Sequence, residues 1–449
     1  MNAKEKLSRG VALVITIIIL LILAGISISA LTNQGLFKNA QKAKKTTEEA
    51  QKKETDLLEQ YESELNKYIE NGRWDGKVNK PELMTGMSAI KFTDPTDSAE
   101  GTTVDTTSND TEWYNYENKK WANAKTEDGS MWVWIPRYAY RIHKENGVET
   151  QKFDIVFLVG LTDNYYDENG RLQTAQRQTS ENQTIVTNGD TYTVHPAFTN
   201  ESSINYANGG WDKELAGIWV AKFEAGYASG NNSATVKASS VNYSQDTSWV
   251  AKIEAGTSSD STQPARNWLD GEYGSTTTAI KYPTFQGLTY SMNYINHNDA
   301  YRISKVLTES GNIYGLNGSS TDSHLMKNSE WGAVAYLSQS KYGLDGTNII
   351  INNVTLENST KSVYAVTGCA GLTSDSNEVT TTIGALNNRT QSSVYVWTQK
   401  NGTGASSTGT IYGIYDLSGG TWERVASIIN NGNSELTTYG NQIVADLNN

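Results

Sequence analysis

The chain of 449 residues has few of the residue types that carry redox or metal chemistry: one cysteine and four histidines. Because Cys369 has no second thiol to join, an intramolecular disulfide and a paired-thiol site are both excluded. The histidines stand singly, without the spacing of a transition-metal cluster, at His143, His195, His297 and His324. We therefore expect structural or surface histidines, a buried apolar role for Cys369, no cofactor and no catalysis.

Charge is also scarce, because only 19% of the residues are charged, and the formal net charge is −12. An acidic chain of this kind would release no phosphate counterions, so nucleic acid is excluded as a partner. Glycine, serine, threonine, asparagine and tyrosine are abundant instead. This composition is typical of extracellular, β-rich binding domains, in which tyrosine provides contact area at a low entropic cost.

One long apolar run is present, VALVITIIILLILAGISISA over residues 11–30, and it follows a short basic segment. About 20 residues at a rise of 1.5 Å cross the roughly 30 Å hydrocarbon core of a bilayer. We expect a basic leader over 1–10 and a single transmembrane helix over 11–31, in contact with membrane lipid. Short basic N-termini usually stay inside, so the C-terminal part is placed outside the cell. A cleaved secretory signal fits less well, because no A-x-A-like site follows the run.

The segment 32–72 is rich in lysine, glutamate, glutamine and alanine. Apolar residues recur at spacings of three, four and three, at Leu58, Tyr61, Leu65 and Tyr68. This spacing predicts an amphipathic stalk helix with a narrow apolar stripe and a solvated opposite face.

The sequence RGVALVITIIILLILAGISI resembles the N-terminal cleavage and methylation segment of type IV pilin-like proteins, in the form common in Gram-positive bacteria. The resemblance implies cleavage between Gly10 and Val11 by a prepilin peptidase, and other pilin-like subunits as partners. Major pilins carry glutamate at the fifth mature position, where this chain has Ile15. That departure argues against assembly into a filament, while a plain uncleaved signal anchor stays an alternative.

Beyond the stalk, the chain reads as short strands and long polar loops. Met131 to Arg141 predicts a strand pair broken at Pro136, and Phe153 to Leu161 a buried strand. Gly217 to Gly226 predicts a third strand, with Trp219, Ala221 and Phe223 on one face and Val220 and Lys222 on the other. A similar sequence from Trp249 to Gly256 indicates a local duplication or an inserted hairpin.

Two helices are expected, over Thr289 to Glu309 and over Lys327 to Tyr342. For the second, Asn328 or Ser329 is the expected N-cap and Gly343 the expected C-cap. Gly409 to Val425 predicts a strand, a glycine-rich turn and a second strand. The fold class is therefore α+β, with an N-terminal transmembrane and stalk helix before a mixed domain. The expected division is 73–128 as linker and edge strands, 129–425 as the head, and 426–449 as a polar tail.

Four blocks of the head resemble the C-type-lectin-like fold of the formylglycine-generating, sulfatase-modifying enzyme family. They are MWVWIPRYAYRI, ELAGIWVAKFEAG, DSHLMKNSEWGAVAYLSQSKYG and GTIYGIYDLSGGTWERV. The last resembles the N-x-x-G-L-x-D-x-x-G-N-V-W-E-W region of the family. The resemblance implies structural motif roles for Trp132, Trp134, Trp219, Trp331, Gly413, Asp416, Gly419, Gly420, Trp422 and Glu423.

The family's enzymes use a pair of cysteines, and the related sulfoxide synthases use three histidines at iron, so neither chemistry suits this chain. The same scaffold serves without catalysis in the variable ligand-binding proteins of diversity-generating retroelements. We therefore predict a membrane-anchored, adhesin-like display protein that binds an unknown surface protein or glycan. The alternatives are a minor pilin or pseudopilin and a homologue of the sulfatase-modifying enzymes.

Two further expectations concern loops and the end of the chain. Loop oxygens of Asp322, Asp375 and Asp416 are candidate calcium ligands, with solvated loop acids as the alternative. The family closes its fold with strands after the W-E pair, whereas here a polar tail follows Val425. Either the chain is truncated or those strands have diverged.

Overall fold

The computed structural model describes residues 78–92, 101–106, 113–177, 184–187, 189–200, 210–226, 283–289, 291–292, 297–352, 354–357, 363–371, 381–383, 395–421 and 423–427. The chain divides into two compact units, Met1–Gly72 and Arg73–Asn449, and all described residues belong to the second. The predicted leader, membrane helix and stalk therefore lie outside the described residues, as do Gly10, Val11, Trp422, Asp375 and the repeat that begins at Trp249. Within the described ranges, no helix has the length and apolar character needed to cross a bilayer.

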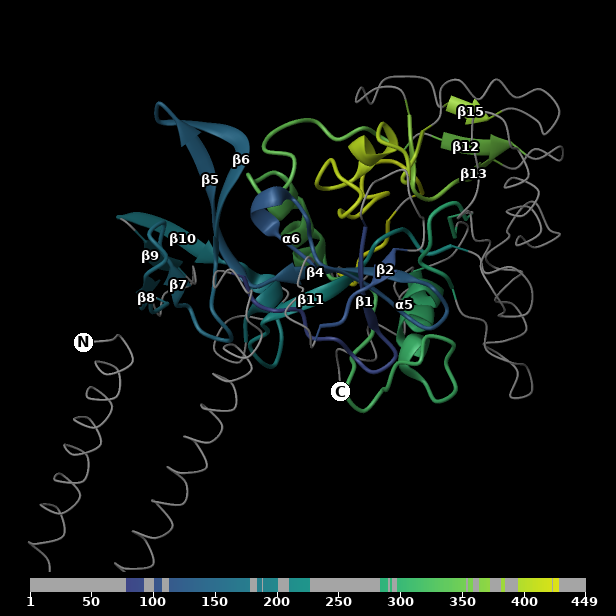
Figure 1. The fold of residues 1–449 in the computed structure, drawn as a ribbon, viewed down its shortest axis with the longest axis horizontal. Helices are drawn as coiled ribbons and strands as arrows, with labels where there is room; N and C mark the ends of the chain where they lie inside the picture. Colours follow the sequence, from purple (N-terminus) through teal and green to yellow (C-terminus); the bar gives the residue numbers. More distant parts are fainter. Residues whose placement is uncertain are drawn as a thin grey trace, which may run out of the picture. The chain divides into compact units, whose positions relative to one another are not determined.

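A five-stranded antiparallel sheet forms the centre of the described part, in the order β11-β4-β3-β1-β2. Its strands are β1 (Ser88–Lys91), β2 (Thr102–Thr103), β3 (Asn123–Lys125), β4 (Met131–Pro136) and β11 (Gly217–Ala221). Figure 1 shows α6 on one side of β4 and β11, and α5 on the other. The two faces of these strands therefore meet different surroundings.

A second sheet has the order β6-β5-β10-β9. It comprises β5 (Tyr138–Glu145), β6 (Val148–Phe157), β9 (Thr184–Thr187) and β10 (Asp190–Val194). The predicted strand pair around Pro136 is confirmed, because this proline ends β4 and β5 begins two residues later. The predicted strand from Phe153 starts earlier than expected, since it belongs to a long hairpin with β5 (Figure 1).

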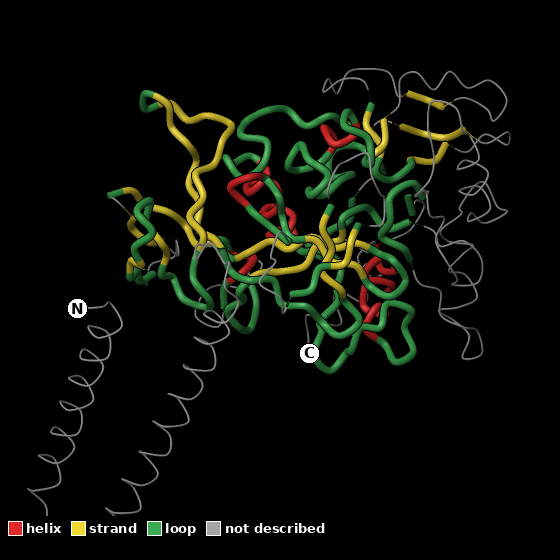
Figure 2. Tube along the Cα trace, viewed as in Figure 1, coloured by secondary structure: helices red, strands yellow, loops and turns green. Residues whose placement is uncertain are grey.

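The remaining strands are short. They are β7 (Tyr165–Tyr166) with β8 (Leu172–Gln173), β14 (Cys369–Ala370) with β16 (Tyr395–Val396), and β12 (Val354–Glu357) between β13 (Val363–Ala365) and β15 (Thr381–Ile383). Single 3-10 turns occur at η1 (Tyr116–Asn118), η2 (Pro196–Phe198), η4 (Val306–Thr308) and η5 (Gly402–Ala405). Figure 2 shows that loops connect most of these elements, as the α+β prediction with few helices requires.

Both expected helices are present, but their ends differ from the prediction. Helix α5 (His297–Lys305) begins later than Thr289, because Met292 donates its backbone N–H to Ala225 O in an extended segment. Helix α6 (Asn328–Ser338) has Lys327 as its N-cap, whose backbone N–H donates to the Glu330 carboxylate over 2.7 Å. The predicted caps at Asn328 or Ser329 and at Gly343 are therefore wrong, and Gln339 ends the helix.

The α6 side of the central sheet is an apolar core. Val133, Ile135 and Val220 pack there with Val334 and Leu337 of α6. Because side chains alternate across a strand, these residues occupy one face while their neighbours occupy the other.

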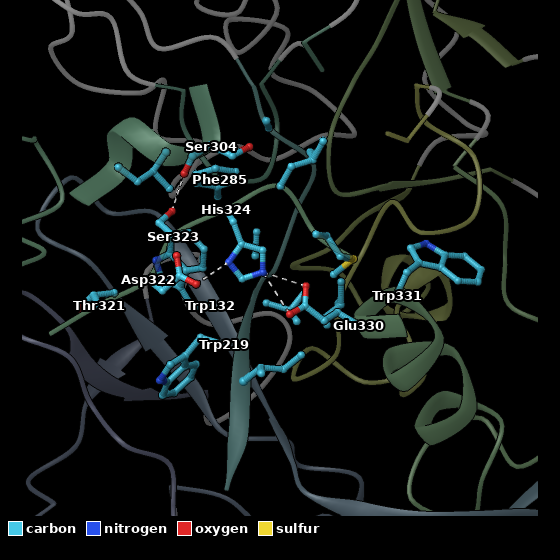
Figure 3. Close-up of a pocket in the computed structure, with 18 of the residues that line it drawn as sticks. Trp132, Trp219, Phe285, Ser304, Thr321, Asp322, Ser323, His324, Glu330 and Trp331 are labelled. Carbon is cyan, nitrogen blue, oxygen red and sulfur yellow. Dashed lines mark hydrogen bonds and ion pairs between the residues drawn. The ribbon is translucent and has the colours of Figure 1, made fainter. Parts of the chain in front are cut away.

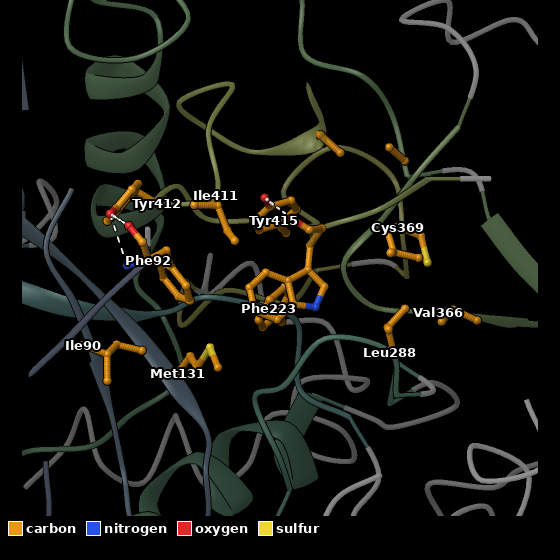
Figure 4. Packing of buried hydrophobic residues seen from close by; sticks show 14 of the residues in the cluster. Ile90, Phe92, Met131, Phe223, Leu288, Val366, Cys369, Ile411, Tyr412 and Tyr415 are labelled. Carbon is orange, nitrogen blue, oxygen red and sulfur yellow. Dashed lines mark hydrogen bonds between the residues drawn. The ribbon is translucent and has the colours of Figure 1, made fainter. Parts of the chain in front are cut away.

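A second core lies beside the loop segment 411–415. Phe223 stacks on Tyr415 with ring centroids 5.4 Å apart, and Figure 4 shows both in one cluster with Cys369. Cys369 is fully buried, which confirms its predicted apolar role.

The prediction of two strands within Gly409 to Val425 is wrong for the described residues of that segment, which form turns and loops. Apart from one isolated bridge between Gly419 and Asn352, their backbone groups are bonded outside any strand pair. Tyr415 N–H donates to Lys222 O over 2.8 Å, and Gly420 N–H donates to Asn352 O over 2.7 Å. Side chains and loop carbonyls therefore replace the partner strand that the pattern implied.

Candidate functional site

A cavity of about 670 Å³ opens on the α5 side of the central sheet. Its walls come from β4 and β11, from α5, from the loop before α6, and from the described part of 414–425. Figure 3 shows aromatic and ionisable side chains from these elements around one space. This size is in the range of small-ligand sites.

One wall of the cavity is aromatic and is built by strand periodicity. Trp132 and Trp134 are two residues apart on β4, and Trp219 of β11 pairs with Trp134. The three side chains therefore share one face of the sheet, and all three line the cavity. Trp134 and Trp219 meet edge to face with centroids 5.3 Å apart, and Trp132 lies 4.9 Å from Phe285. Three predicted motif tryptophans are thus brought together.

Another part of the lining carries His324 between two carboxylates (Figure 3). Its Nε2 lies 3.1 Å from both oxygens of Glu330, and its Nδ1 lies 3.4 Å from Asp322 Oδ2. Burial lowers the pKa of His324, but the bonds to Asp322 and Glu330 outweigh it and raise this pKa to about 9. His324 is therefore an imidazolium at neutral pH, and its charge compensates these carboxylates.

A second group of carboxylates contains Glu224, Asp416 and Glu423. Glu224 accepts the Thr421 N–H over 3.0 Å, while Glu423 accepts the indole N–H of Trp331 over 2.5 Å. Glu224 is half-buried, Glu423 is exposed, and both line the cavity. Trp331 and Glu423, two predicted motif residues from distant segments, therefore meet at this wall.

Asp416 lies behind this wall and connects three segments. Its carboxylate accepts the side-chain amide of Asn352 over 2.8 Å and the backbone N–H of Gly368 over 2.9 Å. The backbone N–H of Glu224 adds a third donor at 3.3 Å. Asp416 is fully buried and has a φ of +68°, a conformation that aspartate adopts more readily than most residues. These contacts fit the structural role that the motif implied.

The three carboxyl groups have raised pKa values because the surrounding protein and the neighbouring acids disfavour their charged forms. Burial and the neighbouring charges of Asp416 and Glu423 raise the pKa of Glu224 well above its usual range. Burial, with Asp416 adding to it, raises the pKa of Glu423 to about 7, and burial also raises the pKa of Asp416. Each accepts hydrogen bonds from neutral donors alone, and no described basic group contributes to these shifts.

The turn that closes the wall needs two glycines. A Cβ on Gly419, at φ +93°, would lie 2.3 Å from Asn352 O. A Cβ on Gly420, at φ +71°, would lie 2.7 Å from Glu224 Oε2. Backbone conformation and close approach therefore both require glycine beside Glu224.

Lys222 is predicted from the sequence only to lie on one face of a strand, but its surroundings in the structure are those of a residue with a specific role. It is fully buried, and its Nζ donates to Asn123 Oδ1 over 2.9 Å, to Ile411 O over 2.5 Å and to Gly413 O over 2.8 Å. Burial lowers its pKa well below the usual value, but all three partners are oxygen acceptors, which match the three N–H groups of an ammonium. Gly413, a predicted motif residue, thus contributes its backbone carbonyl as a hydrogen-bond acceptor for Lys222.

Of the calcium candidates, Asp322 pairs with His324, and the oxygens of Asp416 accept N–H donors. Among the described residues, no group of three or more histidine, cysteine, aspartate or glutamate side chains is placed to hold a metal ion.

Glu224, Glu330 and Phe285 line the cavity without being predicted as site residues from the sequence, and His324 is expected from the sequence only as a structural or surface residue. The signal available for His324 was an acidic residue two positions before it and another six after it, just inside a predicted helix. Comparisons with protein-family models, with curated proteins and with solved structures gave no match to this chain.

Proposed function

We propose that this protein is a membrane-anchored, extracellular ligand-binding protein, and that the cavity beside β4 and β11 is its binding site. The observation that carries the proposal is the cavity itself. It joins a wall of three tryptophans to a wall of oriented carboxylates and an imidazolium. Apolar walls with a few placed polar groups are what small-ligand sites require.

The head takes the C-type-lectin-like fold of the formylglycine-generating enzyme family in this proposal. The contact between Trp331 and Glu423 and the buried position of Asp416 support it, because the resemblance gave these residues structural roles. The segment from Ile411 to Glu423 packs against Lys222 and Glu224, so the motif joins strand β11 to the cavity wall.

Binding without catalysis is part of the proposal. Burial raises the pKa of the Cys369 thiol well above its usual range, and the side chain is not exposed. A thiol of this kind is a poor nucleophile, because the thiolate is the reactive form. The chain has no second cysteine to complete the thiol pair of the family's enzymes.

The binding proposal is tested by screening the full-length chain on glycan and peptide arrays, with Trp219→Ala as the cavity variant. We expect the variant to lose at least about ten-fold in affinity for any specific hit, because an aromatic contact is removed. Leu172→Ala is the control, since Leu172 is exposed on β8 and does not line the cavity. A hit that binds Trp219→Ala and Trp132→Ala as well as the wild type would contradict the assignment of the cavity.

The anchoring proposal needs a separate measurement. Intact mass and N-terminal sequencing of protein extracted from membranes should give a mature chain that begins at Val11 if a prepilin peptidase processes it. A chain that begins at Met1 would indicate a plain signal anchor, and recovery in the soluble fraction would contradict the anchor itself.

A further inference from the structure

We propose that the cavity binds an alkylammonium group, carried by a small amine or by a lysine side chain, beside Glu224 and Glu423. This inference rests on the proposed function, because it names the chemistry that the cavity would select. It is carried by four features of the described residues: unequal charge compensation, aromatic walls, a fixed carboxylate and an ammonium site already present in the fold.

The first feature is the difference between the two acidic walls. Asp322 and Glu330 share the imidazolium of His324. Glu224 and Glu423 accept hydrogen bonds from Thr421 and Trp331, which are neutral donors. Neither carboxyl group therefore has a partner cation among the described residues, and a bound cation would stabilise their ionised forms in a place that a ligand can reach.

The second feature is the balance of charge around the whole cavity. Its lining includes further carboxylates, Glu82 and Asp212, while the basic groups are Lys213, Arg424 and the protonated His324. Carboxylates outnumber basic groups, so the field inside the cavity favours a cation over an anion.

The third feature is the aromatic part of the cavity lining. Trp132, Trp219 and Trp331 line the same cavity, and tryptophan has the ring face that attracts ammonium groups most strongly. Trp331 also donates its indole N–H to Glu423, so one side chain fixes the carboxylate while its ring borders the same space. An alkyl stem would cover the tryptophans, and its ammonium end would reach the carboxylates.

The fourth feature is Lys222, which shows the same chemistry inside the protein. Its Nζ lies 5.2 Å from the ring centroid of Phe92 and 5.4 Å from that of Tyr415, and three oxygens accept its protons. The fold thus holds one ammonium in aromatic and oxygen surroundings two residues before Glu224. We infer that the cavity offers comparable surroundings to a cation from outside.

The test is a titration of the full-length chain, followed by tryptophan fluorescence and calorimetry, with three probes. These are Nα-acetyl-lysine-N-methylamide, the same compound acetylated at Nε, and n-butylammonium. We expect saturable binding of the lysine probe and at least about ten-fold weaker binding of its acetylated form, because acetylation removes the charge and keeps the stem. Comparable affinity for n-butylammonium would indicate a free amine as the source, and much weaker affinity would indicate a lysine of a peptide.

Two variants connect the binding to the named carboxylates. Glu423→Gln and Glu224→Gln keep the size and one acceptor oxygen, and each should weaken the lysine probe by about ten-fold. Glu117→Gln is the control, because Glu117 is an exposed carboxylate paired with Lys341 outside the cavity. Urea midpoints of all three variants show whether each one is folded.

Equal affinity for the charged and acetylated probes, with both lost in Trp219→Ala, would overturn the cation inference and leave the cavity as a ligand site. Absence of saturable binding for all three probes would also overturn the inference. The array screen with Trp219→Ala then decides the proposed function separately.

Discussion

Lys222 and Glu224 lie two residues apart, directly after β11, and their ionisable groups have opposite surroundings. The ammonium of Lys222 is enclosed by three oxygen acceptors and by aromatic rings. The carboxylate of Glu224 accepts a backbone N–H, borders a cavity and has other carboxylates as its charged neighbours. A buried charge satisfied within the fold stabilises structure, whereas one left open at a cavity is a candidate for ligand recognition.

The largest effect is expected from removing the enclosed ammonium of Lys222, which tests whether this group stabilises the fold. Lys222→Met should lower the free energy of unfolding by about 3–5 kcal/mol, because three buried oxygens lose their donors. Urea unfolding measures the change, and Lys400→Met at an exposed site should stay within about 0.5 kcal/mol of the wild type. A decrease in the free energy of unfolding below about 1 kcal/mol for Lys222→Met would contradict a stabilising role for the bonds from this ammonium to Asn123, Ile411 and Gly413.

The next test concerns the carboxylate behind the cavity. Asp416→Asn should destabilise the protein by about 1–3 kcal/mol. The new side-chain amide would place an NH₂ group where a carboxylate oxygen now accepts hydrogen bonds from Asn352 and Gly368. Asp345→Asn is a matched control, since Asp345 also has a positive φ, of 54°, but is exposed. Thermal or urea unfolding that ranks the two variants equally would contradict the structural role of Asp416.

A third test uses pH to separate two histidines. The folded pKa of His324 is about 9, above the usual histidine value of 6.5, so its stabilisation is complete below pH 6.5 and is lost as pH rises to 9. We expect a loss of about 1–2 kcal/mol over this window, and His324→Gln should abolish it. His195 is neutral inside the core, where burial lowers its pKa to about 3, so its contribution disappears instead as pH falls from 6.5. A stability that is flat from pH 6.5 to 9 in the wild type would contradict the ion pairs of His324.

The smallest effect concerns ligand binding. Affinity for the lysine probe should rise by up to about ten-fold from pH 6 to pH 8, because Glu423 loses its proton near pH 7. His324 stays protonated over this range, and Asp322 and Glu330 stay paired with it. Calorimetry at the two pH values measures the change, and affinity that falls with rising pH would contradict a role for the ionised carboxylate.

Periodicity alone predicted part of this site. The alternation around Trp132 and Trp134 and the strand from Gly217 correctly indicated paired strands, and α6 lies within the predicted helix. The wall made by Asp322, His324 and Glu330 could not be derived in the same way, because it depends on where a loop folds against a helix terminus.

The segment from Gly409 shows why the prediction of strands from periodicity is wrong in this part of the chain. Its apolar and glycine pattern predicted strands, but its carbonyls accept hydrogen bonds from the side chain of Lys222, a contact between residues nearly two hundred positions apart in sequence. Glu224 has an ordinary sequence context, and its environment arises only when Thr421 and Asp416 are brought to it by the fold.

The most direct test is the carboxyl pKa of Glu423, measured by carbon NMR on full-length chain labelled at glutamate and assigned with Glu423→Gln. We expect a pKa of about 7 for the free protein and a value at least one unit lower with the lysine probe bound. A pKa near 4.5 that does not change when the probe is added would contradict the central claim that the Glu423 carboxylate binds the ammonium group of a ligand.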